Sequence, residues 1–467
     1  MSSFPAQNQI PLDLQRGPDL LRKEHFGALY YRRESAEFFT LPPNGARLLE
    51  AATRDSVMDL YARSPDAWGL SLGEFLKTVL IWRQQGFLDE DNRCTARIID
   101  DDRSHGALIG PMVVNLQLTR ACNLKCGHCF VDIWSKPDPN ELSLAQFDQL
   151  FGELSAMGTG IVILAGGEPM LRRDFMDIVS LVGTHGLDAA LCTNATLINP
   201  TNAVELLQSP LRWFSISLDG PDAATHDQLR GKGRFAHAVR GMRALVEARR
   251  AGAGDASKAI KMRVTVTGEN LNTLVRFADC ARDIGVDRVV MKPFRHTAED
   301  MGHAPNALYV TRTAYNRATR DCLDQWPKDA PALEIDDGMP TGPATWTGVI
   351  PRFGCVGGTT HASVIYDGRV VACDAVHDAE DWTLHNHSFR DAWRKAPTVV
   401  SWRDLDGNES CNSTCQNGPV CKGGCRARAI GLGGSIDDPD PWSYCSDERG
   451  EAVPSSRSGH PLLPIIG

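Results

Sequence analysis

Short apolar runs typical of β-strands alternate with segments of helical periodicity between residues 105 and 325, and this alternation limits the possible folds more than any other feature. The runs predict strands over 112–118, 161–164, 189–192, 213–217, 262–266 and 288–291, with helices over 144–154, 175–183 and 238–246 and around 274–277. Strands joined by crossover helices pair in parallel, with their carboxyl ends at one edge of the sheet. Six βα steps therefore predict an α/β fold, a partial (β/α)6 TIM-like barrel over residues 105–325.

The first 98 residues contain β-rich runs at 28–31 and 38–41, separated by a polar stretch that is typical of a hairpin turn. Helical spacing follows over 44–52, 56–62 and 71–85, and Ser71-x-x-Glu74 forms a capping box at the start of the last helix. A hairpin and three helices predict a small winged-helix-like module over residues 1–98. The same pattern would also suit a simple cap on the barrel.

Residues 326–467 are rich in Gly, Cys, Asp and Pro, and short strands are expected only near 362–366 and 370–372. Because their apolar content is too low for a large core, we expect a small domain stabilised by bound metal. The net charge of −9 argues against nucleic-acid binding, and no apolar run approaches the roughly 20 residues of a membrane span. No export signal is evident at the N-terminus, so we expect a cytoplasmic protein without membrane partners.

Fourteen cysteines in a chain expected to stay reduced favour metal or redox chemistry over disulfide bonds. Four occur singly and are expected to be plain buried thiols: Cys94, Cys192, Cys280 and Cys322. The first of two groups, Cys122, Cys126 and Cys129, directly follows the first predicted strand of the barrel, where active sites form. Three thiolates suit a 4Fe-4S cube with one open iron, whereas a zinc site would need a fourth ligand such as His128.

The spacing Cys122-x3-Cys126-x2-Cys129 resembles the signature of the radical S-adenosylmethionine (SAM) superfamily, and the similarity extends over the whole βα series. The resemblance implies that the open iron chelates SAM and that SAM is reductively cleaved to a 5′-deoxyadenosyl radical, which abstracts hydrogen from a substrate. Gly166-Gly167-Glu168 at the end of the second strand resembles the family's GGE motif. Its glycines would let the backbone approach SAM, and Glu168 would accept from the SAM ammonium.

Further positions resemble SAM-contacting segments of the family. Asn194 after the third strand, and Ser217 and Asp219 at the end of the fourth, match segments that meet the ribose and carboxylate of SAM. Arg230 is a candidate partner for the SAM carboxylate, and His128 stands where the family places an aromatic residue near the adenine. Asn194 and Asp219 would otherwise cap turns, and Arg230 would form a surface ion pair. No catalytic acid or base is indicated.

The second group of cysteines resembles the SPASM extension of a subset of radical SAM enzymes. The resemblance implies one fully ligated auxiliary 4Fe-4S cluster on Cys411, Cys415, Cys421 and Cys445, and a second on Cys355, Cys373 and Cys425. The second cluster lacks one cysteine, and His361 occupies the place of the missing ligand, so either His361 binds iron or the iron is open. Three residues instead of two separate Cys411 from Cys415, and structural zinc remains the alternative for the group.

The N-terminal module resembles the PqqD-like peptide-recognition domain, in which a leader peptide adds a strand beside the hairpin and lies against the third helix. Together the resemblances imply a maturase that oxidatively modifies or crosslinks a ribosomally made precursor peptide, with a flavodoxin- or ferredoxin-type electron donor. Two alternatives stay open. One is a SPASM enzyme that acts on a small molecule or a tetrapyrrole, and the other is a non-catalytic, metal-stabilised binding protein.

Overall fold

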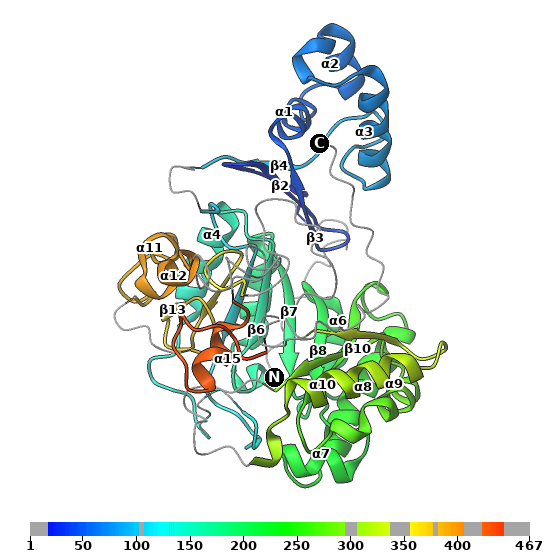
Figure 1. Ribbon diagram of the computed structural model, residues 1–467, viewed down its shortest axis with the longest axis vertical. Helices are drawn as coiled ribbons and strands as arrows, with labels where there is room; N and C mark the ends of the chain where they lie inside the picture. Colours follow the sequence, from blue (N-terminus) through cyan, green and yellow to red (C-terminus); the bar gives the residue numbers. More distant parts are fainter. Residues whose placement is uncertain are drawn as a thin grey trace, which may run out of the picture.

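The computed structural model describes residues 17–101, 107–129, 131, 133, 135–294, 306–336, 355–376, 382–405 and 423–442. Its centre is a nine-stranded sheet in the order β11-β10-β9-β8-β7-β6-β5-β12-β13 (Figure 1). The six predicted barrel strands are confirmed as β5 (Val113–Gln117), β6 (Ile161–Ala165), β7 (Asp188–Thr193), β8 (Leu211–Ser217), β9 (Ala259–Val266) and β10 (Arg288–Pro293). All neighbours among these six are parallel, so their carboxyl ends meet at one edge.

Helices cover one face of this sheet and bury its apolar side chains. They are α4 (Leu144–Ala156), α5 (Phe175–Thr184), α6 (Pro200–Gln208), α7 (Ala223–Arg230), α8 (Arg234–Arg250), α9 (Phe277–Ile284) and α10 (Arg312–Gln325). The predicted capping box of Ser143 and Gln146 at the start of α4 is present. Leu116, Leu164 and Leu191 lie in the main core, at most 1% exposed. No helix among the described residues is long and apolar enough to cross a bilayer.

The sheet extends past residue 325, beyond the predicted barrel. Strand β11 (Ala332–Ile335) pairs in parallel with β10, and β12 (His361–Val364) pairs in parallel with β5. Strand β13 (Val370–Val371) completes a short antiparallel pair with β12. Three helices follow the strands: α11 (Phe389–Lys395), α12 (Pro397–Arg403) and α15 (Arg426–Gly431). The cysteine-rich region therefore contributes strands to the central sheet as well as its own small helices.

The N-terminal module contains a four-stranded sheet in the order β3-β2-β1-β4 and three helices. The predicted hairpin is confirmed as β2 (Gly27–Arg32) and β3 (Glu37–Leu41), and the helices as α1 (Pro43–Ala51), α2 (Val57–Arg63) and α3 (Leu72–Gln84). The capping box at Ser71 is also present. The strands β1 (Leu20–Glu24) and β4 (Arg97–Ile99) were not expected, and they turn the hairpin into a sheet.

This module packs against the amino ends of the barrel strands, opposite the end that carries α7 (Figure 1). The Tyr31 hydroxyl donates to Asp188, the first residue of β7, at 2.6 Å, and the Arg33 guanidinium lies 3.4 Å from the same carboxylate. Arg22 of β1 pairs with Glu24 at 2.6 Å and donates to the carbonyl oxygen of Gly158 at 3.2 Å. Because these polar groups are buried, the module is an integral part of the packed structure rather than a tethered appendage.

Candidate active site at the carboxyl ends of the strands

The cysteine loop, residues 119–129, follows β5 and holds its three predicted thiols at the carboxyl edge of the sheet. The thiols of Cys122, Cys126 and Cys129 are partly buried, and each acts electrostatically on at least one other. The backbone N–H of Leu124 donates to the Cys122 sulfur at 3.4 Å, and Arg230 Nη1 lies 3.8 Å from the Cys126 sulfur. The structure thus brings the three predicted ligands together beside one buried cation.

The chemistry of this donor set fits an iron–sulfur cluster. Burial raises the pKa of Cys122 to about 11 and that of Cys129 to about 12, so without a positive partner both thiols would stay protonated. Iron supplies that positive charge and binds the thiolate form. His128, the fourth ligand of the zinc alternative, instead directs Nε2 at Asp219, 3.1 Å away. Within the described residues no group of three or more His, Cys, Asp or Glu side chains is placed to hold a single metal ion.

The glycines of the GGE segment contact the cysteine loop itself. Gly166 has φ near +128°, and a Cβ there would lie 2.5 Å from the Thr119 carbonyl oxygen. A Cβ on Gly167 would lie 2.1 Å from the Ala121 carbonyl oxygen, and the Gly167 N–H donates to Thr119 at 2.7 Å. Only glycine permits this approach. The missing side chains let this segment pack closely against the loop that carries the thiols, and the approach of its backbone to SAM stays a prediction.

Glu168 connects the GGE segment to the end of the next strand. Its fully buried carboxylate accepts from the Thr193 hydroxyl at 2.7 Å and from the Asn194 N–H at 2.9 Å. Burial raises the pKa of Glu168, although these hydrogen bonds counteract the shift. Asn194 in turn donates to Asn123 of the cysteine loop at 2.9 Å, and its own side chain accepts from the Thr196 N–H. Glu168 and Asn194 therefore lie in one network with the cysteine loop.

Asp219 is the fully buried centre of a second cluster, just beyond the end of β8 at Ser217. One oxygen accepts from the Thr265 N–H at 2.8 Å, and the other contacts both His128 and Arg230. Burial alone would raise the pKa of Asp219, but the neighbouring charges of Arg230 and His128 lower it well below its ordinary value. Arg230 is therefore a largely buried partner of Asp219 and Cys126, not a surface ion pair.

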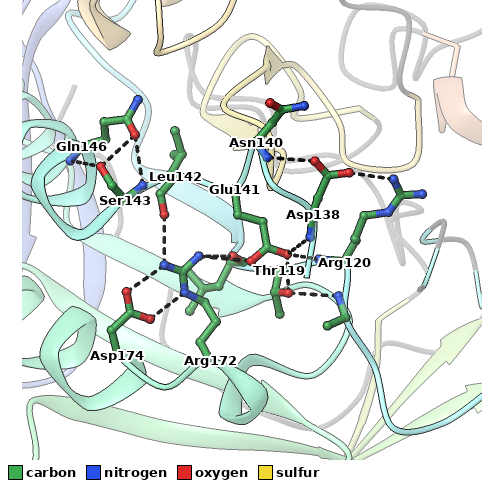
Figure 2. A network of polar contacts seen from close by, with 12 residues as sticks. Thr119, Arg120, Asp138, Asn140, Glu141, Leu142, Ser143, Gln146, Arg172 and Asp174 are labelled. Atoms are coloured by element: carbon green, nitrogen blue, oxygen red, sulfur yellow. Dashed lines mark hydrogen bonds and ion pairs between the residues drawn. The ribbon is translucent and has the colours of Figure 1, made fainter. Parts of the chain in front are cut away.

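A polar network that sequence reasoning missed anchors the first residues of the cysteine loop (Figure 2). Glu141 accepts from the Thr119 hydroxyl at 2.5 Å and from the Arg120 N–H at 3.1 Å. Arg172 donates to the carbonyl oxygens of Leu118 and Leu142 and lies 3.5 Å from Glu141. These side chains come from separate loops and match no motif, so no local signal in the sequence could have identified them.

The described cysteines of the second group also lie together. Cys355 precedes β12, Cys373 follows β13, and Cys425 precedes α15. Burial raises the pKa of Cys373 well above its ordinary value, and the charges of Cys355 and Cys425 add to the shift. His361 lies on β12, where its Nδ1 contacts the Thr360 hydroxyl and its charged neighbours are Lys292 and Asp336. The predicted ligands Cys411, Cys415, Cys421 and Cys445 lie outside the described residues.

Comparisons with known proteins agree with this geometry. Residues 116–281 match the family model described as the radical SAM superfamily. The mycofactocin maturase MftC of Mycobacterium ulcerans is 32% identical over 345 residues, which cover 72% of this chain and 88% of that protein. The AdoMet-dependent heme synthase of Nitratidesulfovibrio vulgaris is 28% identical, over 70% of this chain and 90% of that protein.

Among solved structures, Streptococcus suis SuiB bound to the precursor peptide SuiA matches with a TM-score of 0.68 and 17% identity, over 91% of this chain and 97% of that one. The cysteine loop follows β5 of a parallel sheet, and the alignments with the two relatives above cover most of each relative's length. These findings lead to one conclusion. This chain is an enzyme of the radical SAM superfamily.

Proposed function

We propose that this enzyme oxidatively modifies or crosslinks a ribosomally made precursor peptide. Membership of the superfamily implies a 4Fe-4S cluster and SAM, which together supply a 5′-deoxyadenosyl radical when bound. The observation that carries the proposal is the N-terminal module, because within the described residues β3 forms one edge of its sheet and α3 presents an apolar face. Relatives named mycofactocin maturase, and a similar fold solved with a precursor peptide, support it.

Residues at the carboxyl ends would hold the cofactors. Cys122, Cys126 and Cys129 would bind the cluster, while Gly166 and Gly167 keep their loop in place. His128 is 8% exposed and its Nδ1 has no hydrogen-bond partner among the described residues, so it can face a ligand beside the cluster. Glu168, Asn194, Ser217, Asp219 and Arg230 would complete the SAM site, with Asp219 holding His128 and Arg230 in place.

We also propose that the C-terminal cysteines bind auxiliary clusters. Cys355, Cys373 and Cys425 are close enough for their charges to interact, as the ligands of one cluster must be. Such a cluster would accept the electron released when a substrate radical is oxidised, which suits a net oxidation. A flavodoxin- or ferredoxin-type protein would supply the electron that begins each turnover.

Peptide capture would use the exposed edge of the N-terminal sheet. Strand β3 is an edge strand, and four of its five residues are only partly buried. An edge strand presents unpaired backbone groups with which an extended peptide can pair. On α3, Leu72, Leu76 and Leu80 recur every fourth residue and are 59%, 46% and 58% exposed. Leucines at this spacing form one apolar stripe, which would contact apolar side chains of the leader peptide.

The experiment incubates the iron-reconstituted enzyme anaerobically with SAM, a reductant and a candidate precursor peptide, such as any short peptide encoded next to its gene, and follows the peptide by mass spectrometry. Loss of two hydrogens from the peptide is the expected result. Leu76→Glu should weaken peptide binding about tenfold or more, because a buried leucine contributes about 1.5–3 kcal/mol. Lys77→Glu, on the same helix but outside the stripe, is the matched control. Processing by the Leu76 variant at the unaltered rate would exclude capture by this stripe.

A point substitution tests peptide capture more specifically than removal of residues 1–98 does. Deletion of the module would expose Asp188 and the other polar groups at the amino ends of the strands, and would destabilise the barrel for reasons unrelated to peptide capture.

A SPASM enzyme that acts on a small molecule or a tetrapyrrole is the second candidate. It is favoured by the heme synthase relative, which matches over 90% of its own length. In that case the Leu76 variant would retain full activity on the small substrate, and no peptide would change mass. Family membership favours either enzyme over the non-catalytic binding protein.

A further inference from the structure

The concave face of the central sheet, opposite the helices, carries polar side chains that the proposed cofactor sites do not use. On β9, Met262 and Val264 are fully buried beneath the helices, so the alternating Lys261 and Arg263 face the other way. The same alternation puts Gln117 of β5 and Cys192 of β7 on the concave face. Gln117 is the last residue of β5 and Cys192 the second-last residue of β7. Arg263 pairs with Ser217, the last residue of β8, and Lys261 lies two positions earlier on β9.

The strand register places the side chains of β7, β8 and β9 next to one another on this face. Cys192 pairs with Ser215 of β8, and Ser215 pairs with Lys261 of β9. Arg263 reaches across β8, because its Nη1 lies 3.8 Å from the Cys192 sulfur. The Lys261 ammonium lies 5.0 Å from the centre of the Trp213 ring.

The charges on this face are unevenly matched. Arg288 pairs with Glu334 at 2.9 Å and Lys292 with Asp336 at 2.5 Å, so the outer strands β10 and β11 balance their own charges. In the described part of the chain no ion pair joins Lys261 or Arg263 to a carboxylate. Burial lowers the pKa of Lys261, and the charge of Glu334 counteracts this shift only in part.

Gln117 gives an independent sign of a missing ligand. Its side chain is 3% exposed, and neither amide atom has a hydrogen-bond partner among the described residues. Buried amides that lack partners are uncommon, because each unmade hydrogen bond is costly. The amide can donate to an oxygen or accept from an N–H of a molecule bound in the concavity.

We propose that Lys261 and Arg263 bind a carboxylate group of the substrate, with Gln117 as a further hydrogen-bonding partner in the same concavity. The inference rests on the proposed function in that it takes the substrate to be a peptide. The carboxylate then belongs to an acidic side chain or to the peptide C-terminus. A guanidinium and an ammonium around one carboxylate give charge-assisted hydrogen bonds, which would hold the substrate against this face of the sheet.

Cys192 reports on this site without any need to know the substrate. The cluster-loaded enzyme is treated anaerobically with iodoacetate or iodoacetamide, which are similar in size but differ in charge. Alkylation of the peptide that contains Cys192 is then followed by mass spectrometry. Any effect of Arg263 on the reactivity of the thiol is common to both reagents, so the ratio of the two rates isolates the preference for an anion.

We expect the iodoacetate-to-iodoacetamide ratio to fall about fivefold in Arg263→Gln, the effect of one unit charge about 4 Å away in water. In Lys261→Gln the ratio should fall about twofold, because Lys261 lies two strands, roughly 10 Å, from Cys192. Arg263→Lys keeps the charge and should retain most of the ratio, which separates a loss of charge from a loss of folding. Lys77→Gln, an exposed cation of α3, should leave the ratio unchanged. An equal ratio in the unaltered enzyme and both glutamine variants would overturn the proposal.

Four probes at millimolar concentration distinguish the source of the carboxylate. N-acetylphenylalanine carries a C-terminal carboxylate and N-acetylglutamate α-amide a side-chain carboxylate, while N-acetylphenylalanine amide and N-acetylglutamine amide carry none. Protection of Cys192 from iodoacetamide by either acid, but by neither amide, supports the proposal and identifies the source. Equal protection by acids and amides contradicts it.

SAM also carries a carboxylate, so its binding is measured by equilibrium dialysis in parallel. Weaker SAM binding by the Lys261 or Arg263 variant, together with protection of Cys192 by SAM alone, would assign these cations to SAM and overturn the proposal. Because neither readout requires peptide processing, failure here leaves the maturase proposal intact. A confirmed carboxylate site in an enzyme that changes no peptide would instead refute the maturase proposal and favour a small carboxylate substrate.

Discussion

The two ends of the parallel sheet are both buried and polar, yet they are built differently. At the amino ends, opposite charges from the N-terminal module and the barrel meet, as Arg33 meets Asp188. At the carboxyl ends, three partly buried thiols lie near Arg230, whose charge Asp219 already neutralises. In the first arrangement arginines face a carboxylate, whereas the thiolates of the second require added positive charge. Burial and polarity alone therefore do not mark a ligand site in this protein, but missing charge does.

The largest expected effect comes from Cys126→Ala at the carboxyl ends. Loss of one of three ligands should abolish the proposed SAM-binding cluster and reduce SAM cleavage below detection, while iron bound by the C-terminal cysteines remains. Formation of 5′-deoxyadenosine and iron content per chain are the measurements. Cys94→Ala, a buried thiol of the N-terminal module, is the control and should keep both. Continued 5′-deoxyadenosine formation by the Cys126 variant would refute the assignment of the loop.

At the amino ends, Asp188→Ala should instead reduce stability. The change leaves Arg33 and Arg212 buried without their shared carboxylate, which costs roughly 3–5 kcal/mol of the free energy of unfolding. Urea unfolding measures the loss, and SAM cleavage per folded molecule should not change. Asp279→Ala removes an exposed ion pair with Arg282 and should cost less than about 1 kcal/mol. Equal losses in the two variants would mean that the module is not held by this contact.

A third substitution tests whether Glu141, which holds the first residues of the cysteine loop, is needed for SAM cleavage. Glu141→Gln keeps the shape of the side chain but places an amide near the Arg172 guanidinium. The first residues of the loop should shift, and SAM cleavage should fall roughly tenfold, since small misplacements at a reacting centre are costly. The electron paramagnetic resonance signal of the reduced cluster with SAM should change, while unfolding is little affected. Glu205→Gln, on the exposed surface of α6, provides the comparison; similar rates for both variants would assign Glu141 a merely structural role.

Local patterns in the sequence predicted most of this fold because most elements have a recognisable pattern within a few consecutive residues. The six barrel strands are short apolar runs, and both capping boxes are four-residue motifs. Strand β4 escaped prediction because it pairs with β1, more than seventy residues away. Strand β1 forms a hairpin with β2, but its sequence Leu-Leu-Arg-Lys-Glu is not a β-rich run. Helix α7 was also not predicted, because it buries only His226 and Leu229 and therefore lacks an apolar stripe.

The candidate site divides in the same way. The cysteines and the GGE segment have fixed spacing and could be named from the sequence, but the close packing of the glycines against the cysteine loop could not. Glu141, Arg172 and Asn123 carry no spacing signal, because they are positioned by three different loops. His226 is a further case: it accepts from the Asp219 N–H through Nδ1, and burial lowers its pKa to about 4, which keeps it a neutral acceptor.

The smallest expected effect sharpens the contrast between the two ends. Tyr31→Phe removes the hydroxyl that donates to Asp188, but Arg33 and Arg212 still neutralise the carboxylate. The loss should be about 1 kcal/mol, the typical net contribution of one hydrogen bond, and clearly less than for Asp188→Ala. Unfolding of the Tyr31 variant, the Asp188 variant and the double variant forms a double-mutant cycle that isolates the coupling between the two residues. A Tyr31 loss as large as that of Asp188→Ala would show that the hydroxyl, rather than the opposed charges, holds the module against the barrel.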